Sequence, residues 1–358
     1  MSLYPITSGH LPRGCSLATM VAPVQSNAGV LFPFWGRTGG LVGEFYHGML
    51  TEGGGIGMFG KRDLQRVSRL VMLILSLVLM LGGAAWADNL VIHFIDVGQG
   101  DSVLVQTPSR ATVLVDAGDT KAGREVVVPY LEELGIEYLD LVVMTHPHFD
   151  HIGGLIPVLK RYPVEQVLAD GQIHTTRTYE DLLRLIFEKE IPFRLARAGE
   201  ELTIPGLDEV LILNPQEPLL QGLNNNSVAL WLRHGDIAVL LTGDIEAAAE
   251  ERILARGQFP KAQILKVAHH GSGTSTTPAF LQAVSPENAI ISLGADNTYN
   301  HPHGETLRHL EGAEINIWRT DLRGTIIVVS DGVSYRVLGE GETPSLAHDT
   351  AVEVEVSH

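Results

Sequence analysis

Cysteine is almost absent from this sequence, because Cys15 is the only one among 358 residues. The chain cannot form an internal disulfide, and no segment beyond residue 15 can offer a thiolate to a metal ion. This absence is compatible with an oxidising compartment without proving one. A metal site in the rest of the chain would have to be built from histidine and carboxylate side chains.

Basic residues are also scarce, with 25 Lys and Arg against 42 Asp and Glu. Residues 1–87 hold 3 acidic and 6 basic residues, so residues 88–358 hold 39 acidic against 19 basic residues, a formal charge of −20. Such a surface repels polyanions unless its basic residues cluster. The charge therefore argues against non-specific DNA binding.

The N-terminal part does not read as a folded domain. Residues 1–57 are rich in Gly, poor in charge and without periodicity, and we expect them to be a spurious or disordered extension. Residues 58–87 have the parts of a Sec signal peptide: a basic segment after Met58, an apolar run from Leu70 to Leu81, and small residues ending at Ala87. Cleavage there predicts a periplasmic or secreted protein without stable membrane association.

An uncleaved membrane anchor is the alternative, since residues 70–85 approach the minimum length of a spanning helix. After this segment, alternating strand and helix patterns over residues 88–338 predict one α/β domain. Residues 339–358 are polar and acidic, and we expect a disordered tail.

Four potential metal ligands lie within six residues, His146, His148, Asp150 and His151. They follow an apolar segment, residues 138–144, that is typical of a buried strand, so we expect them on a loop at its end. Imidazole and carboxylate ligands suit zinc, with manganese possible, and a site with an open position can activate water. A surface loop rich in histidine is the alternative interpretation.

Three further strand patterns end in acids or histidines, at Asp116, at Asp244 and at the pair His269 and His270. Each has an ordinary alternative. Asp116 could serve a turn, Asp244 could cap the helix predicted over residues 245–256, and the histidines could be a buried, hydrogen-bonded pair.

The run from His146 to His151 resembles the second signature motif of the metallo-β-lactamase superfamily. The resemblance implies an αβ/βα four-layer sandwich, with two mixed sheets flanked by helices and a metal site at one edge. It also implies that Asp116 supports the metal loop through hydrogen bonds and that Asp244 bridges two cations. One of His269 and His270 would complete the second metal site, and the other would face the substrate.

An ordered series of motifs is similar to one branch, the C-terminal domain of ComEC/Rec2-like competence proteins and its exported relatives. The series comprises residues 96–101, 115–118, 145–154, 226–227, 241–244, 266–272 and 300–303. The resemblance implies a phosphodiesterase or nuclease that acts on a small phosphodiester or on nucleic acid.

The sequence departs at one motif from the lactam-hydrolysing members of the superfamily. Lactam-hydrolysing members usually carry another metal-binding histidine before the bridging acid, whereas residues 222–227 read Gly-Leu-Asn-Asn-Asn-Ser. Either the first metal has fewer protein ligands, or His174, His301 or His303 supplies one.

The remaining candidates lie on motif loops. Asn226, Ser272, His301 and His303 could contact substrate, although a structural role in the loop is equally open for Asn226, Ser272 and His303. Asp96 and Asp101 could shape a turn or support the metal ligands from behind.

The expected chemistry is hydrolytic. Two divalent cations would lower the pKa of a shared water toward about 7, and Asp150 could orient that water for attack. The alternatives are a β-lactam or lactone hydrolase and a non-catalytic metal-binding module.

Overall fold

The computed structural model describes residues 89–257 and 260–342. The predicted extension, the signal segment and most of the predicted tail lie outside these residues. No helix within them is both long and apolar enough to cross a bilayer.

The first sheet has eight strands in the order β14-β13-β1-β2-β3-β4-β5-β6. Their bounds are β1 Leu90–Phe94, β2 Val103–Gln106, β3 Thr112–Val115, β4 Leu139–Met144, β5 Val164–Ala169, β6 Phe193–Leu195, β13 Ile326–Ser330 and β14 Tyr335–Leu338. The pairs from β14 to β3 are antiparallel, and those from β3 to β6 are parallel. Strands β1, β2 and β3 thus form an antiparallel meander.

The second sheet has six strands in the order β12-β11-β10-β9-β8-β7. They are β7 Glu209–Asn214, β8 Ala229–His234, β9 Ile237–Leu241, β10 Ile264–Lys266, β11 Asn288–Ile291 and β12 Asn316–Arg319. Strands β9 to β12 are parallel, while β7, β8 and β9 form antiparallel pairs. Both sheets are therefore mixed, as predicted.

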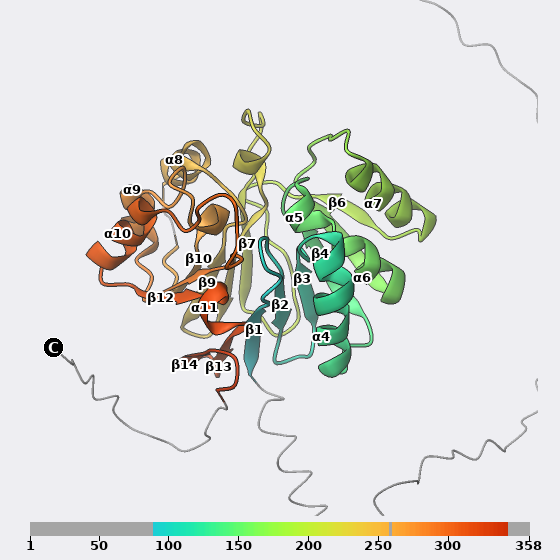
Figure 1. Ribbon diagram of the computed structural model, residues 1–358, viewed down its shortest axis with the longest axis horizontal. Coiled ribbons are helices and arrows are strands. Elements are labelled where there is room, and N and C mark those ends of the chain that lie inside the picture. Colours follow the sequence, from blue (N-terminus) through green and yellow to red (C-terminus); the bar gives the residue numbers. More distant parts are fainter. Residues whose placement is uncertain (1–88, 258–259, 343–358) are drawn as a thin grey trace, which may run out of the picture. The chain divides into compact units, whose positions relative to one another are not determined.

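Helices cover the outer face of each sheet (Figure 1). The helical elements along the first sheet are α3 Thr120–Ala122, the π-helix η1 Gly123–Val127, α4 Val128–Glu133, α5 Phe149–Ile152, α6 Leu155–Arg161 and α7 Arg177–Glu188. Those of the second half are η2 Asn224–Asn226, α8 Ala247–Ala255, η3 Ala268–Gly271, α9 Pro278–Val284, α10 Gly304–Gly312 and α11 Thr320–Arg323.

Three buried apolar clusters hold these layers together. The central one joins inward-facing residues of both sheets, such as Phe94 and Val143 with Val239 and Ile290. A second packs η1, α4, α6 and α7 onto the first sheet, and a third packs α8, α9 and α10 onto the second. The order of layers is helix, sheet, sheet, helix, which is the predicted four-layer sandwich. Its interior strands are buried on both faces, which explains continuous apolar runs such as that of β9.

Asp119 caps helix α3 by accepting a hydrogen bond from the Ala122 amide. One local prediction was wrong. The metal motif is not wholly a loop, because Asp150 and His151 lie on the short helix α5. His148 has an extended backbone conformation and directly precedes this helix.

Strands β3 and β4 are parallel, and so are β9 and β10, so within each pair the carboxyl ends meet at one edge of a sheet. The loop 95–102 reaches the same place. Gly100, at φ +133°, brings it so close to Asp150 that a Cβ at residue 100 would overlap the Asp150 carbonyl.

Candidate metal centre

Asp116 ties the metal motif to the end of β3. Its carboxylate is fully buried and accepts hydrogen bonds from the Thr145 amide at 2.9 Å, the Thr145 hydroxyl at 2.5 Å and His151 Nδ1 at 2.8 Å. Burial raises the pKa of Asp116, and the hydrogen bond from His151 opposes that rise. Because Nδ1 of His151 donates to Asp116, Nε2 is the atom left to bind a ligand.

Asp244 lies at the centre of three histidines. Its Oδ2 is 3.2 Å from His151 Nε2, 3.5 Å from His270 Nε2 and 3.8 Å from His146 Nε2. Burial raises its pKa, but His151 and His270 outweigh burial and hold the pKa well below the usual range. Asp244 is therefore anionic and within reach of a cation bound to any of the three rings.

Asp244 does not cap the following helix. Helix α8 begins at Ala247, with Glu246 in the capping position, so the interpretation of Asp244 as an N-cap is wrong. The Asp244 amide instead donates to the Ser227 hydroxyl, and Oδ1 of its carboxylate has no hydrogen-bond partner.

The adjacent histidines both have positive φ, 51° for His269 and 54° for His270, and their rings have different partners. His270 is buried, and its Nδ1 donates to the Ser292 carbonyl at 2.8 Å. Its Nε2 is left 3.5 Å from Asp244 Oδ2 and 3.7 Å from Asp150 Oδ2. The structure thus brings His270, rather than His269, into the ligand cluster.

His269 lies at the pocket wall with 22 % of its side chain exposed. Its Nδ1 is 3.5 Å from Glu246 Oε1 and 3.3 Å from the Thr274 hydroxyl. Burial lowers its pKa, which favours a neutral ring.

Asp101 and Lys266 form a buried ion pair beside this cluster. Lys266 Nζ is 2.5 Å from Asp101 Oδ2, donates to the Gly243 carbonyl at 3.2 Å and lies 3.9 Å from Asp244 Oδ1. Asp101 Oδ1 lies 3.5 Å from His270 Nδ1. Asp101 could shape a turn or support the metal ligands, and these contacts favour support of the ligands. Sequence reasoning missed Lys266, although a lysine closing an apolar strand was a usable signal.

The donor set fits a divalent cation. Nitrogen and oxygen atoms of His146, His151 and Asp244 lie within 4.8 Å of one another, and so do those of Asp150, His151 and His270. His151 Nε2, His270 Nε2 and Asp244 Oδ1 are buried without a hydrogen-bond partner. Such atoms are costly to bury without a partner, and a cation held by Asp150, His151 and His270 would satisfy both ring nitrogens. Histidine with carboxylate suits zinc or manganese.

His148 belongs to neither group, but its Nδ1 lies 2.9 Å from His146 Nε2. Burial lowers the pKa of both rings, which favours the neutral form that binds metals.

Comparison with known proteins agrees with this geometry. A family model described as the metallo-beta-lactamase superfamily matches residues 95–295. The chain belongs to the metallo-beta-lactamase superfamily. The match spans β4, β9 and β10, which position the candidate ligands.

Within this superfamily the chain is ComEC/Rec2-like. It is 35% identical to ComE operon protein 3 of Bacillus subtilis over 253 residues, which cover 66% of this chain and 32% of that protein. It is 31% identical to recombination protein 2 of Haemophilus influenzae over 238 residues, which cover 65% of this chain and 28% of that protein. The chain thus spans about a third of the length of these relatives.

Among solved structures, the metallo-beta-lactamase fold protein YhfI from Bacillus subtilis superposes with a TM-score of 0.47 at 13% identity. The superposition covers 67% of this chain and all of that one.

Lactam-hydrolysing members usually carry a further metal-binding histidine in the region of residues 222–227. Here that region contains the short helix η2. Asn224 Nδ2 lies 3.3 Å from His269 Nε2, so this loop reaches the wall of the metal pocket. Asn226 is buried; its Oδ1 accepts from Leu220, and its amide nitrogen donates to Gln172 and to the carbonyls of Leu220 and Gly222. Of substrate contact and a structural role in the loop, these bonds favour the structural role for Asn226.

Other candidates lie outside the ligand groups. His174 bonds to Thr176 on the loop before α7, and Asp96 accepts from the Gly98 amide within its own turn. Ser272 is buried and contacts Thr274, and His303 accepts from the Gly273 amide. His301 lines the pocket, with its ring centre 5.6 Å from that of His269. Within the described residues, none of these supplies the expected further ligand.

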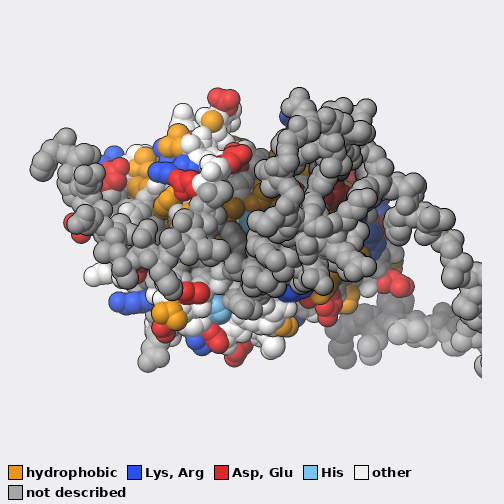
Figure 2. Space-filling view, turned by 90° about the horizontal axis from the view of Figure 1, so that it is seen from below, with side chains coloured by type: hydrophobic (Ala, Val, Ile, Leu, Met, Phe, Trp, Pro, Cys, Tyr) orange, Lys and Arg blue, Asp and Glu red, His pale blue; other side chains and the backbone are white. Residues whose placement is uncertain are grey.

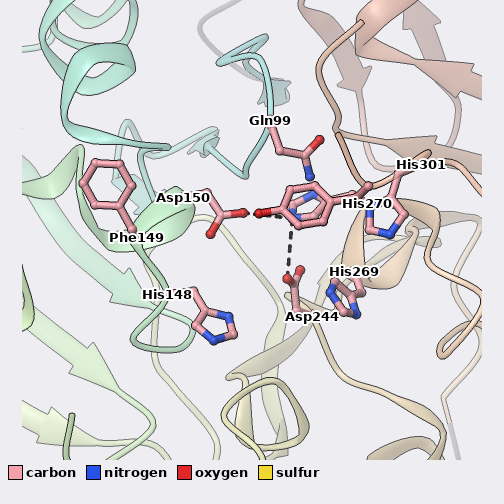
Figure 3. A pocket seen from close by; sticks show the side chains of 9 residues that line it. Gln99, His148, Phe149, Asp150, Asp244, His269, His270 and His301 are labelled. Carbon is pink, nitrogen blue, oxygen red and sulfur yellow. Dashed lines mark ion pairs between the residues drawn. The ribbon is translucent and has the colours of Figure 1, made fainter. Parts of the chain in front are cut away.

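A pocket of about 240 Å³ opens onto the centre (Figure 3). Its lining consists of Gln99, His148, Phe149, Asp150, Asp244, His269, His270, Tyr299 and His301. No Lys or Arg is among these residues. Asp150 and His270 point into it from opposite sides, from α5 and from the turn after β10.

Proposed function

We propose that this chain is an exported, metal-dependent phosphodiesterase with a dinuclear centre. The observation that carries the proposal is the convergence of unpartnered, buried ligand atoms from His151, His270 and Asp244 at the floor of an open pocket. Members of the superfamily are generally hydrolases. The name of one relative, recombination protein 2, favours a substrate related to nucleic acid.

The candidate ligands divide into two groups that share His151. One comprises His146, His151 and Asp244, and the other comprises Asp150, His151 and His270. His148 lies beside the first group, with Nδ1 2.9 Å from His146 Nε2. Bound divalent ions, zinc or manganese, would supply a water of lowered pKa and polarise the phosphoryl oxygens. Asp116 and the Ser292 carbonyl hold His151 and His270 in the orientation that leaves Nε2 free.

Two side chains face the space in which a substrate would react. Asp150 has 33 % of its side chain exposed and can accept a hydrogen bond from the attacking water. His269 lies on the pocket wall, where a ring N–H can donate to the charge that develops on oxygen.

The electrostatics favour a small or single-stranded substrate over duplex DNA. The pocket lining has no Lys or Arg. On the face seen in Figure 2, the acidic and basic side chains that are not covered are interspersed, without a broad basic patch. Duplex binding without base recognition depends on such a patch.

The hydrolysis of a β-lactam or lactone is the rival enzymatic function. Parallel assays of bis(p-nitrophenyl) phosphate and nitrocefin, after loading with zinc or manganese, separate the two. We expect phosphodiester turnover without lactam turnover. Lactam turnover alone would establish the rival, and metal binding without either activity would indicate a non-catalytic module.

Export is the second part of the proposal and rests on residues 58–87. Fractionation of cells that express the full chain tests it. We expect a periplasmic or secreted product that begins at Asp88, whereas an uncut, membrane-bound product would favour the anchor.

A further inference from the structure

Two exposed aromatic rings lie at the mouth of the metal pocket. Phe149 is 51% exposed and Tyr299 is 60% exposed, and both line the pocket. Single exposed apolar side chains are common on proteins. Two aromatic rings beside one set of metal ligands, in a pocket whose lining has no Lys or Arg, offer a candidate contact surface for a planar ligand.

Phe149 is held at one side of the ligands. It is the first residue of α5, directly between His148 and Asp150. Its ring passes so close to Gly153 that a Cβ there would lie 3.1 Å from the ring edge. Figure 3 places Phe149 beyond Asp150, on the side of the pocket opposite His301.

Tyr299 is supported at the other side. Its ring stacks on that of His301, with centres 5.6 Å apart and planes inclined by 24°. His301 in turn packs edge-on against His269 and His303. One face of Tyr299 is therefore occupied by His301, and the exposure of the side chain leaves the other face accessible.

We propose that Phe149 and Tyr299 are stacking surfaces for the nucleobases of a phosphodiester whose phosphate lies over the metal ligands. This inference rests on the proposed phosphodiesterase function and names its substrate class: small nucleotides or single strands with unpaired bases. Planar bases stack on aromatic side chains regardless of sequence, so each ring would strengthen the binding of an unpaired base. Stacking would replace the Lys and Arg contacts that the pocket lacks. Duplex DNA would be a poor substrate because its bases are stacked inside the helix.

The test compares two esters with the same leaving group, thymidine 5′-(p-nitrophenyl phosphate) and methyl p-nitrophenyl phosphate. The measured quantity is the ratio of their kcat/KM values for the metal-loaded full chain. We expect Phe149→Ala or Tyr299→Ala to lower this ratio about tenfold, mainly through KM for the thymidine ester. Phe149→Tyr and Tyr299→Phe should retain the ratio because they retain a ring. Phe187→Ala, which removes an 82%-exposed ring on α7 away from the pocket lining, is the matched control.

An unchanged ratio in both alanine variants would overturn the stacking proposal while leaving the phosphodiesterase intact. If the wild type cleaves neither ester, the proposed function fails, and binding then tests the rings separately. Calorimetry would compare thymidine 5′-monophosphate with inorganic phosphate on the metal-loaded chain. A preference for the nucleotide that is lost in Tyr299→Ala and Phe149→Ala would support the rings, and equal affinities in the wild type would refute them.

Discussion

Lys266 Nζ lies 2.5 Å from Asp101 Oδ2, and both side chains are buried. This ion pair joins the loop after β1 to the end of β10, so it connects the two sheets beside the candidate ligands. It also places a fixed positive charge 3.9 Å from Asp244 Oδ1. Breaking one partner of such a pair leaves the other charge buried and uncompensated.

Lys266→Met is therefore expected to lower the free energy of unfolding by about 3–5 kcal/mol. Asp101→Asn combined with Lys266→Met should recover part of this loss, because no unpaired charge remains. Denaturant unfolding measures both effects, and Lys121→Met, which removes an exposed lysine, is the control. Strictly additive losses in the double variant would refute the pairing.

Alanine variants of the two adjacent histidines should separate an effect on metal binding from an effect on turnover. Because His270 Nε2 faces Asp244 and Asp150, His270→Ala should reduce the metal bound per chain. His269→Ala should retain the metal and lower kcat, because His269 lies on the pocket wall. Elemental analysis with parallel kinetics distinguishes them, and the reverse pattern would assign the ligand to His269.

Asp116 should act through His151. In Asp116→Asn, an amide nitrogen in the position of Oδ2 could not accept from His151 Nδ1, so the ring would be free to take the other tautomer. We expect metal affinity to fall roughly 10- to 100-fold, measured by competition with a chelator. Asp181→Asn on the exposed side of α7 is a control for lost charge. Unchanged affinity in Asp116→Asn would show that the hydrogen bond does not tune the ligand.

His93 gives a pH dependence away from the pocket. It is buried on β1, with Nε2 donating to Gln106 Oε1 and Nδ1 accepting from the Tyr130 hydroxyl. Burial lowers its pKa from 6.5 to about 4. The unfolded chain therefore binds more protons between these values, so the contribution of His93 to stability is lost as pH falls from 6.5 toward 4.

The loss should be on the order of 3 kcal/mol by pH 4. His93→Gln, which keeps a donor and an acceptor, should remove this part of the pH dependence of unfolding. Parallel curves for the wild type and the variant would contradict the assignment.

The sequence predicted the sandwich and the residues that converge, because strands that end in His or Asp are visible in the chain order. It could not choose between His269 and His270, because that depends on the Ser292 carbonyl and on two positive φ angles. It left Asp244 with two roles until the helix start at Ala247 removed one of them. Lys266 was missed because its partner, Asp101, lies 165 positions away and only the fold brings the two together.

Metal content and phosphodiester turnover of Asp244→Ala beside the wild type test the central claim most directly. Asp244 belongs to one ligand group, and its Oδ2 lies 3.5 Å from His270 Nε2 of the other, so we expect about two metal ions per wild-type chain, fewer in the variant, and turnover abolished. His148→Ala should also lower the metal content and abolish turnover. Full metal content and full turnover in Asp244→Ala would contradict a dinuclear centre at this place.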